Sequence, residues 1–198
     1  MGEAVGIGSR RLVFAPRDAT DGAAAFGVLV DRHHGAVVRY LTRQTGDPEL
    51  AADLAQETFL AAFKGHDQLA DEAAFPGWLF GIARNQLRME WRRRRLRRLV
   101  SLDWLAAGAG TAAPALSRPD GSGASGERDR IQRVLDGMSP TLREALLLHG
   151  LCGFTGNEIA GILSIAPDAA RKRIARAEAE FRRRDGGGGT PDGTDHHA

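Results

Sequence analysis

The chain has 198 residues, of which 27 are Lys or Arg and 25 are Asp or Glu, so its formal net charge is only +2. On its own, this near-neutral charge argues against a nucleic-acid role. The length permits one domain or two small ones, and the 42% hydrophobic content is enough for a core in each. The single Cys152 excludes a disulfide framework and a multi-cysteine metal site. Because no apolar run has the length of a signal peptide or a membrane span, we expect a soluble, cytoplasmic protein.

Two long helices are predicted near the start of the chain, after an N-terminal tail at residues 1–20 that we expect to be disordered. The first helix has side chains at three- and four-residue intervals that are typical of one buried face. These are Phe26, Leu29, Val30, His33, Val37, Tyr40 and Leu41. Asp47 and Pro48 then provide an N-cap and a first-turn proline for a second helix, which ends near Phe63.

The second helix also has a polar face, opposite its apolar residues. Asp53, Gln56 and Glu57 share this face at helical spacing. The pattern alone is weak evidence for a binding site, since such faces are usually only solvated. The chain has no glycine-rich phosphate loop, no pair of His one turn apart on a helix and no nucleophile beside a base. We therefore expect no enzymatic activity, no catalytic residue, no cofactor and no metal.

A third helix is predicted from about Phe75 to Arg98, and positive charge dominates its second half. Residues 84–98 contain 8 Arg against the single Glu90, whereas residues 1–83 contain 7 basic and 11 acidic residues. Charges this dense repel one another unless an anion screens them, and a polyphosphate backbone does so with release of counterions. Nucleic-acid binding is therefore favoured over a charge run that is only solvated or that binds protein.

Aromatic residues lie close to this basic segment: Phe75, Trp78 and Phe80 precede it, and Trp91 lies within it. Aromatic rings beside a basic groove can hold unpaired bases by stacking. Phe75, Trp78 and Phe80 also fit a purely structural role in the core. Trp91 has charged neighbours on both sides and is harder to bury, so it is the better candidate for stacking.

The composition changes at about Ser101, and residues 106–126 are mostly Ala, Gly, Ser and Pro. Such a segment cannot bury enough apolar surface to offset its ordering entropy, so residues 100–127 are predicted to form a flexible linker. A glycine run at 186–189 predicts a disordered tail over residues 185–198. The linker separates two predicted helical units, at residues 21–99 and 128–184.

Helical periodicity continues through the second unit. The first helix of this unit has Ile131, Val134, Leu135 and Met138 on one face. The second helix carries Leu142, Leu146 and His149. Ser139 and Pro140 cap the second of these helices, and Thr155 with Glu158 is a capping-box signature for a short third helix. Pro167 begins the last helix. The inner residues of the third and last helices are Ile159, Ala160 and Leu163, then Ala170, Ile174, Ala177 and Phe181. A short helix, a tight turn and a longer basic helix form a helix-turn-helix.

The last helix carries a second basic cluster, since residues 171–184 contain 7 basic and 2 acidic residues. Its exposed face is expected to present Ala169, Lys172, Arg173 and Arg176, with Arg171 at the flank. A recognition helix inserts its N-terminal residues into the major groove, where Arg and Lys read guanine and small residues permit close approach. Asp168 repels phosphates but can accept a hydrogen bond from a cytosine amino group. The alternative is a helical hairpin that binds only protein.

Three longer stretches follow one another along the chain. They are RYLTRQTGDPELAADLAQETFLAAFKG (39–65), FPGWLFGIARNQLRMEWRRRR (75–95) and SPTLREALLLHGLCGFTGNEIAGILSIAPDAARKRIARAEAEFRR (139–183). In this order and spacing, they resemble the bacterial RNA polymerase sigma factors of the extracytoplasmic-function (ECF) group. The resemblance covers about residues 23–184. One departure from the family is the unusual opening of the short third helix, at Gly156 and Asn157.

The resemblance implies an all-α protein with two small domains, sigma-2 and sigma-4, on either side of the linker. It implies that the clamp helices of the polymerase beta-prime subunit are bound by Asp53, Gln56 and Glu57. It implies that the minus-ten promoter element is bound by Arg84, Asn85, Arg88, Trp91 and Arg92. The loop at 65–74 would capture a flipped base. The minus-thirty-five element would be read by Ala169, Arg171, Lys172, Arg173 and Arg176.

The implied function is to direct core RNA polymerase to specific promoters and to aid promoter melting. The implied partners are the beta-prime clamp helices and beta flap of core polymerase, promoter DNA and an anti-sigma factor, which would provide any membrane contact. Two alternatives remain: a helix-turn-helix regulator that acts without polymerase, and a sigma-like protein-interaction adaptor. A metal-dependent nuclease is disfavoured because no carboxylate or His cluster lies near the basic segments.

Overall fold

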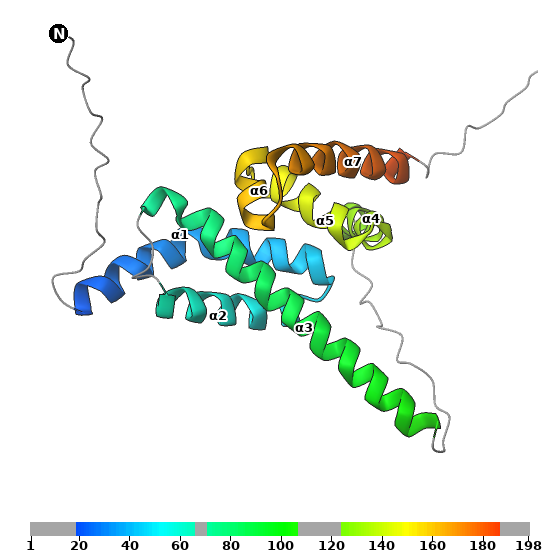
Figure 1. Ribbon diagram of the computed structural model, residues 1–198, viewed down its shortest axis with the longest axis horizontal. Helices are drawn as coiled ribbons and strands as arrows, with labels where there is room; N and C mark the ends of the chain where they lie inside the picture. Colours follow the sequence, from blue (N-terminus) through cyan, green and yellow to red (C-terminus); the bar gives the residue numbers. More distant parts are fainter. Residues whose placement is uncertain (1–18, 66–70, 107–123, 187–198) are drawn as a thin grey trace, which may run out of the picture.

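The computed structural model describes residues 19–65, 71–106 and 124–186, and all regular structure in these ranges is helical (Figure 1). The first unit contains α1 (Ala19–Thr45), α2 (Pro48–Gly65), the 3-10 turn η2 (Glu72–Ala74) and α3 (Phe75–Ala106). The second contains α4 (Ala124–Gly137), α5 (Pro140–Leu146), the π-helical turn η3 (Leu147–Leu151), α6 (Gly156–Leu163) and α7 (Pro167–Gly186). The predicted all-α fold is confirmed. Within these ranges, no helix is both long and apolar enough to cross a membrane.

Helices α1 and α2 form an antiparallel hairpin whose turn lies at Gly46 and Asp47 (Figure 1). Gly46 has a φ of 70°, a conformation that glycine adopts without steric cost. Asp47 Oδ1 accepts hydrogen bonds from the backbone N–H groups of Glu49 and Leu50, both at 3.1 Å, which confirms the predicted N-cap. Most of the predicted inner residues of α1 are buried, and the other two are half-buried. The hairpin therefore follows directly from local sequence signals.

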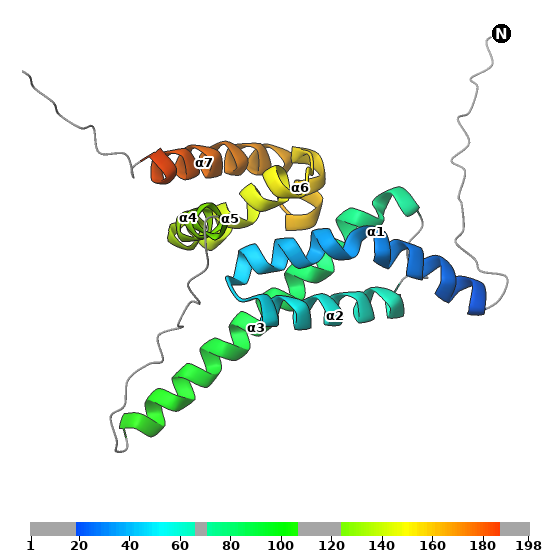
Figure 2. The same cartoon turned by 180° about the vertical axis from the view of Figure 1, so that it is seen from behind.

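Helix α3 crosses the hairpin and projects beyond it (Figures 1 and 2). It continues to Ala106 instead of ending near Arg98, so the first residues of the range expected as a linker are helical. Glu90 pairs with both Arg94 and Arg97, which offsets part of the charge repulsion in this helix. The other end of the expected linker is also helical, because α4 begins at Ala124. Residues 1–18, 107–123 and 187–198, which include most of the expected linker and tails, lie outside the described residues.

The second unit contains the predicted helix-turn-helix. Thr155 Oγ1 accepts a hydrogen bond from the backbone N–H of Glu158, and Glu158 Oε2 accepts one from the backbone N–H of Thr155 at 2.7 Å. This reciprocal pair confirms the capping box at the start of α6. Ser164 ends α6 in the left-handed conformation, with a φ of 54°, and turns the chain into α7 at Pro167. Ala170, Ile174 and Ala177 are buried on the inner stripe of α7, as predicted.

The region around α5 differs from its prediction in two details. Ser139 occupies the N-cap position, but its side chain makes no capping hydrogen bond. Pro140 in the first turn favours the start of the helix instead, because its fixed φ suits a helix. His149 is exposed, because the π-helical turn η3 changes the helical register and buries Leu147 and Leu148 instead. The His149 Nδ1 atom lies 2.9 Å from the carbonyl oxygen of Phe154, so the ring holds the loop that leads to α6.

The two units pack directly against each other. Helices α5 and α6 lie over α1 and α3, and α7 lies on the far side of α6 (Figures 1 and 2). The Phe80 ring of α3 meets Tyr40 of α1 edge-on, with centroids 5.3 Å apart, and it meets Phe154 of the second unit at 5.0 Å. Buried residues from both units therefore form one continuous hydrophobic core.

Candidate nucleic-acid interface

The second half of α3 presents a basic stripe. Its members repeat at intervals of three and four residues and so share one helix face: Arg84, Arg88, Trp91, Arg92 and Arg95. All except Arg84 are exposed. Arg88, Arg92 and Arg95 form no ion pair with any described residue, so their charge is available to an external anion.

The opposite face of α3 is compensated in part. Glu90 accepts hydrogen bonds from Arg94 and from Arg97, both at 2.9 Å. The hydrogen bond from Arg94, together with the charge of Arg97, lowers the pKa of the Glu90 carboxyl from its ordinary value. The one acidic residue in this segment thus neutralises arginines on the side away from the basic stripe. The uncompensated charge of α3 is therefore concentrated on the stripe, although the exposed Arg93 carries unpaired charge on the far side.

The aromatic residues separate into the two roles that the sequence left open. Phe75 and Phe80 are 1% and 2% exposed and belong to the core. Trp78 is half-buried: its ring centroid is 5.9 Å from that of Phe75, and its indole packs beside Gly65 at the end of α2. Trp91 is 37% exposed within the basic stripe, between Arg88 and Arg95. Trp91 therefore remains the candidate for stacking on an unpaired base.

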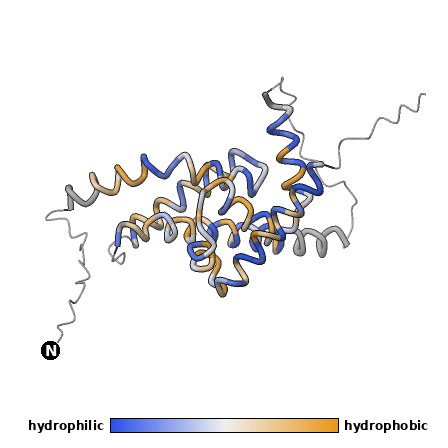
Figure 3. Tube along the Cα trace, turned by 90° about the horizontal axis from the view of Figure 1, so that it is seen from above, coloured by the Kyte–Doolittle hydropathy of each residue, from blue (hydrophilic) through white to orange (hydrophobic). Residues whose placement is uncertain are grey.

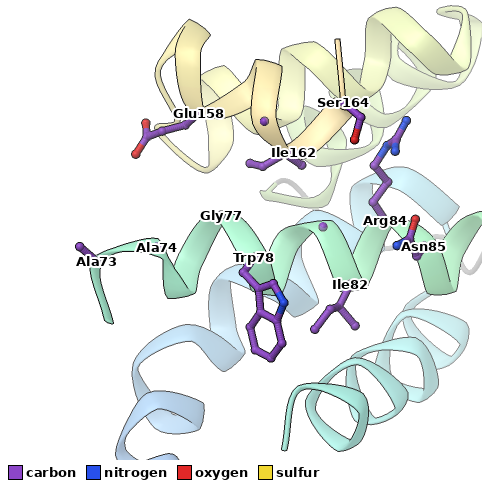
Figure 4. A pocket seen from close by; sticks show the side chains of 12 residues that line it. Ala73, Ala74, Gly77, Trp78, Ile82, Arg84, Asn85, Glu158, Ile162 and Ser164 are labelled. Atoms are coloured by element: carbon purple, nitrogen blue, oxygen red, sulfur yellow. The ribbon is translucent and has the colours of Figure 1, made fainter. Parts of the chain in front are cut away.

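A groove of about 580 Å³ separates the first half of α3 from α6 (Figure 4). Arg84 and Asn85 line it on the α3 side, and Ile162 and Ser164 line it on the α6 side. Arg84 Nε donates a hydrogen bond of 2.7 Å to Glu144 Oε1 of α5, and both side chains are mostly buried. Five residues of α3 were predicted to bind DNA. The structure shows that two of them face the second unit: Arg84 pairs with it, and Asn85 lines the groove between them. The sequence did not indicate this arrangement.

The exposed face of α7 matches the predicted one with two refinements. Ala169, Lys172 and Arg176 are exposed, whereas Arg173 is half-buried. Arg171 points to the flank, where it pairs with Asp168 and donates a hydrogen bond of 3.3 Å to Asn157 Oδ1. Asp168 therefore forms an ion pair with a neighbouring Arg, and its side chain remains 80% exposed.

The unusual start of α6 now has a structural reason. A Cβ atom at Gly156 would lie only 3.1 Å from Arg171 Cγ, closer than most side chains approach each other. Glycine at this position lets the stem of Arg171 pass across the end of α6 to reach Asn157. The Gly156–Asn157 pair thus accommodates the contact between the two helices of the helix-turn-helix.

The end of α7 pairs its own charges. Glu178 lies 3.9 Å from Arg182, and Glu180 pairs with both Arg183 and Arg184. The hydrogen bond from Arg184 is the main cause of the lowered pKa of Glu180. The positive charge that remains unpaired among the described residues of α7 comes from Lys172, Arg173 and Arg176. These residues lie in the first half of the helix.

The polar face of α2 forms a separate surface. Asp53, Gln56 and Glu57 are all exposed, and neither carboxylate pairs with a described cation. Leu60, one turn further on, is 53% exposed, and the neighbouring Phe63 is 43% exposed. Sequence reasoning missed these two residues. For Leu60, the available signal was its place on the polar face, three residues after Glu57 and four after Gln56.

Phe63 also connects this surface to the apolar start of α1, which is orange in Figure 3. Its ring packs edge-on against Phe26, with centroids 5.2 Å apart. Val28, in the same part of α1, is 57% exposed. Acidic and apolar groups thus lie exposed on the α1–α2 hairpin, as in many surfaces that bind a basic protein partner.

No other part of the described chain has the features of a chemical site. In the ranges that the structure describes, no three His, Cys, Asp or Glu side chains are grouped to hold a metal ion. Cys152 is half-buried, and burial raises the pKa of its thiol to about 12, far from that of a reactive thiolate. The predicted base-capture loop at 65–74 falls partly on residues 66–70, which lie outside the described residues.

Comparison with known proteins gives the family. Residues 29–97 match the family model for Sigma-70 region 2, and residues 128–181 match the model for Sigma-70 region 4. The chain is 34% identical over 163 residues to the RNA polymerase sigma factor CarQ of Myxococcus xanthus, with 82% of this chain and 90% of CarQ covered. This chain belongs to the ECF sigma factors. It directs promoter-specific initiation by RNA polymerase, and sigma factors are not enzymes.

Other relatives of this ECF sigma factor agree with that assignment. The ECF sigma factor SigL of Mycobacterium tuberculosis is 34% identical over 163 residues, which cover 81% of this chain and 88% of SigL. The solved structure of CnrH in complex with the cytosolic domain of CnrY is 29% identical, with a TM-score of 0.59 over 81% of this chain and 87% of that one. RpoE of Bartonella quintana, solved with the anti-sigma factor NepR, has the same fold, with a TM-score of 0.65 at 22% identity over 81% of this chain and 96% of that one.

Proposed function

We propose that the two basic faces bind different elements of the promoter. The stripe on α3 binds the minus-ten element, mainly through Arg88, Trp91 and Arg92 and, in an open form of the molecule, through Arg84 and Asn85. The face of α7 reads the minus-thirty-five element through its predicted residues, with Lys172 and Arg176 foremost. The observation that carries this proposal is the basic stripe of α3: Arg88, Arg92 and Arg95 are exposed and pair with no described acid, whereas Glu90 neutralises Arg94 and Arg97 away from the stripe.

The acidic face of α2 is the binding surface for core polymerase under the same proposal. Asp53 and Glu57 are unpaired carboxylates beside an exposed Leu60, which together suit a basic helical surface such as the beta-prime clamp helices. The second unit contacts the beta flap. Because the α2 surface is separate from the basic stripe of α3, one small unit can bind polymerase and DNA at the same time.

Under the same proposal, Trp91 aids promoter melting. An exposed indole between two arginines can stack on an unpaired base while the guanidinium groups hold the backbone on either side. The loop at 65–74 is the proposed pocket for a flipped base. This arrangement stabilises the open strand without any covalent step.

An anti-sigma factor is the proposed regulator. The Bartonella RpoE was solved with the anti-sigma factor NepR, and CnrH was solved with the cytosolic domain of CnrY. For this chain, an anti-sigma protein would cover the polymerase and DNA surfaces named above and would provide any link to the membrane. The sigma factor itself acts where its polymerase is, in the cytoplasm.

A face-specific double substitution tests the role of α3. We expect Arg88→Ala with Arg92→Ala to lower promoter affinity of the reconstituted holoenzyme by about 10- to 100-fold and to reduce the salt slope of binding by about 2, since two phosphate contacts are lost. Run-off transcription from the same promoter should fall in parallel. The measurements are titrations of labelled promoter DNA at several salt concentrations.

The matched control removes the same charge from the other side of the same helix. Arg94→Ala with Arg97→Ala should change promoter affinity by less than about threefold, because both residues are held by Glu90 and face away from the stripe. Equal losses from the two double variants would show that only total charge matters and would refute the assignment of a DNA-binding face.

A further inference from the structure

The surface of α2 that we propose for polymerase continues from acidic into apolar side chains. Asp53 and Glu57 are exposed and pair with no described cation. Leu60 follows Glu57 by three residues and is 53% exposed, and Phe63, three residues further on, is 43% exposed. These four residues share one face of α2, which we call the acidic–apolar stripe. A ligand that matches it carries cations at one end and apolar side chains at the other.

A segment of the same chain has this composition. Residues 10–14, with the sequence RRLVF, carry two cations and three apolar side chains and contain no acid. The segment precedes α1, which begins at Ala19. Read back from α1, its apolar side chains come first and its cations follow. Read back from the end of α2, the stripe presents apolar side chains first and acids next, so the two patterns are complementary.

The start of α1 lies close enough to the stripe for this segment to reach it. Helices α1 and α2 run antiparallel, so the start of α1 and the end of α2 lie at the same end of the hairpin (Figures 1 and 2). Phe26 of α1 meets Phe63 of α2 with ring centroids 5.2 Å apart. Ala19 is seven residues before Phe26, or about 10 Å of helix, whereas the five residues from Phe14 to Ala19 can span about 17 Å. Phe14 can therefore reach Phe63.

We infer that residues 10–14 bind the acidic–apolar stripe in the free chain and so compete with core polymerase for α2. The competition rests on the proposed function, because it exists only if this face binds polymerase. The binding of the segment to α2 does not depend on that function. A basic segment of the chain thus takes the position proposed for a basic surface of polymerase, and its removal should favour the holoenzyme.

The lengths of the two partners agree when they run antiparallel. Four residues of extended chain, from Phe14 back to Arg10, span about 13 Å. Glu57 lies about 9 Å along the helix from Phe63, and Asp53 lies about 15 Å along it. With Phe14 placed at Phe63, Arg10 therefore falls between the two carboxylates.

The alternation of side chains gives the bound segment an inner and an outer side. In an extended chain, every second side chain points the same way. With Phe14 on the inner side, Leu12 and Arg10 share that side, and Arg11 and Val13 lie on the other. We therefore expect Leu12 and Phe14 to contribute most of the apolar contact.

A weak contact is sufficient because the segment belongs to the same chain. A short connection gives an effective concentration of about 1 mM. If residues 10–14 as a separate peptide bound the stripe with a dissociation constant of about 0.2 mM, the tethered segment would occupy it in about five of six chains. Polymerase would then bind with an apparent affinity about sixfold lower than without the segment.

Binding of the segment can be detected by nuclear magnetic resonance of the full chain. A spin label at Ser9→Cys, in a Cys152→Ala background, should broaden the amide resonances of residues 53–57 and leave those of α7 unchanged. The control is an equal mixture of spin-labelled chains and isotope-labelled chains without the spin label, in which no broadening is expected. Broadening in the mixture would show that a second copy is the occupant and would overturn the inference.

Exchanging the charges makes this measurement specific. Arg10→Glu with Arg11→Glu should reduce the broadening at least threefold, because the segment then repels the acids of α2. Adding Asp53→Lys with Glu57→Lys should restore it, because attraction returns with the charges exchanged. The inference is overturned if the unmodified chain shows no broadening, or if the two Glu substitutions leave the broadening unchanged.

The competition is measured by titrating the labelled sigma factor with core polymerase. Leu12→Ser with Phe14→Ser should raise the affinity about three- to tenfold without changing the net charge. The matched control, Val5→Ser with Ile7→Ser, makes the same change at the same spacing earlier in the chain and should stay within about twofold of the unmodified protein. A lower affinity of the Leu12 and Phe14 variant would show that the segment binds polymerase itself, which would also overturn the inference.

Failure of the proposed function has a different signature. If Asp53→Lys with Glu57→Lys leaves polymerase affinity unchanged while the broadening still responds to charge exchange, the polymerase assignment of α2 fails and the competition fails with it. If that reversal weakens polymerase binding but changes in residues 10–14 alter neither broadening nor affinity, the inference fails and the proposed function stands.

Discussion

The first unit leaves charges of both signs unpaired, whereas the second unit pairs most of its acidic residues with arginine. On α2, Asp53 and Glu57 are exposed without a described cation, and on α3 Arg88, Arg92 and Arg95 of the basic stripe pair with no described acid. In the second unit, Glu127 pairs with Arg130, Asp168 with Arg171, and Glu180 with two arginines. Glu144 takes its partner from the other unit.

This difference shows that a count of charges says little about what a surface binds. The net charge of +2 is the sum of an acidic face, a basic stripe and a set of internal pairs. The unpaired charges define the surfaces that need a partner, because an ion pair within the chain already satisfies both of its members. By this criterion, the first unit presents two surfaces that need a partner, and the second unit presents one.

The largest expected effect comes from reversing the acidic face of α2. Asp53→Lys with Glu57→Lys should weaken association with core polymerase by about 100-fold or more, since it turns attraction toward a basic helix into repulsion. Both side chains are exposed, so helical content and thermal unfolding should stay close to those of the unmodified chain. Fluorescence anisotropy of the labelled sigma factor, titrated with core polymerase, measures the change.

The second unit provides the control for this reversal. Glu127→Lys with Glu178→Lys makes the same change in net charge on residues that are paired within the chain. This variant should bind core polymerase within about threefold of the unmodified protein. If both double variants lose binding equally, the distinction between unpaired and paired acids fails.

The next effect concerns the paired and unpaired cations of α7. Lys172→Ala with Arg176→Ala should lower affinity for a specific promoter by about 10- to 30-fold, and non-specific DNA binding by less, because unpaired cations on the reading face contact bases as well as phosphates. Arg171→Ala should have a smaller effect, since Asp168 and Asn157 already hold that side chain. Competition assays with specific and random duplexes measure both quantities.

Arg183→Ala with Arg184→Ala is the matched control on the same helix. Glu180 compensates both arginines, so their loss should reduce specific and non-specific binding alike, and only slightly. A drop in promoter specificity as large as that of the Lys172 and Arg176 variant would contradict the placement of the reading face in the first half of α7.

Much of the fold was predictable because its signals are local. The inner face of α1, the Asp47 cap and the Thr155 capping box each depend on residues within one or two helical turns. The register change at η3 was not predictable, since a π-helical turn arises from packing, and it moved His149 to the surface. The end of α3 at Ala106 was not predicted either, because the prediction ended the helix near Arg98, where the composition begins to change.

The residues of the three candidate binding faces were predictable from the sequence, but the packing of the two units against each other was not. Helical spacing placed Asp53 and Glu57 on one exposed face, and it grouped the arginines of α3 and the cations of α7. The docking of the two units was not foreseeable, because Arg84 and Glu144 are 60 residues apart and no periodicity links them. The partner of Arg171 was also missed, although Asp168 lies three residues before it, a spacing that allows a helical ion pair.

The smallest expected effect tests the pairing within the second unit through the pH dependence of its stability. In the capping box, hydrogen bonds from the Thr155 hydroxyl and then from its backbone N–H lower the pKa of Glu158 from its ordinary value of 4.5. A carboxyl whose pKa is lowered by folding stabilises the protein above that ordinary value, and this contribution is lost as the pH falls through the lowered pKa. Thr155→Ala should cost about 1 kcal/mol at pH 7, as for other N-cap losses.

Glu158→Gln separates the charge of this pair from its hydrogen bonds. The amide oxygen can still accept from Thr155, so stability at pH 7 should fall by less than in Thr155→Ala. Between pH 7 and pH 3, the unmodified chain should lose more stability than Glu158→Gln. The Glu158 carboxylate takes up a proton in this range whereas the amide does not, and all other acids are the same in the two proteins. Urea unfolding at a series of pH values measures the difference. Parallel stability curves for the two proteins would show that the Glu158 charge contributes nothing to the cap, and that pairing in the second unit is weaker than its geometry indicates.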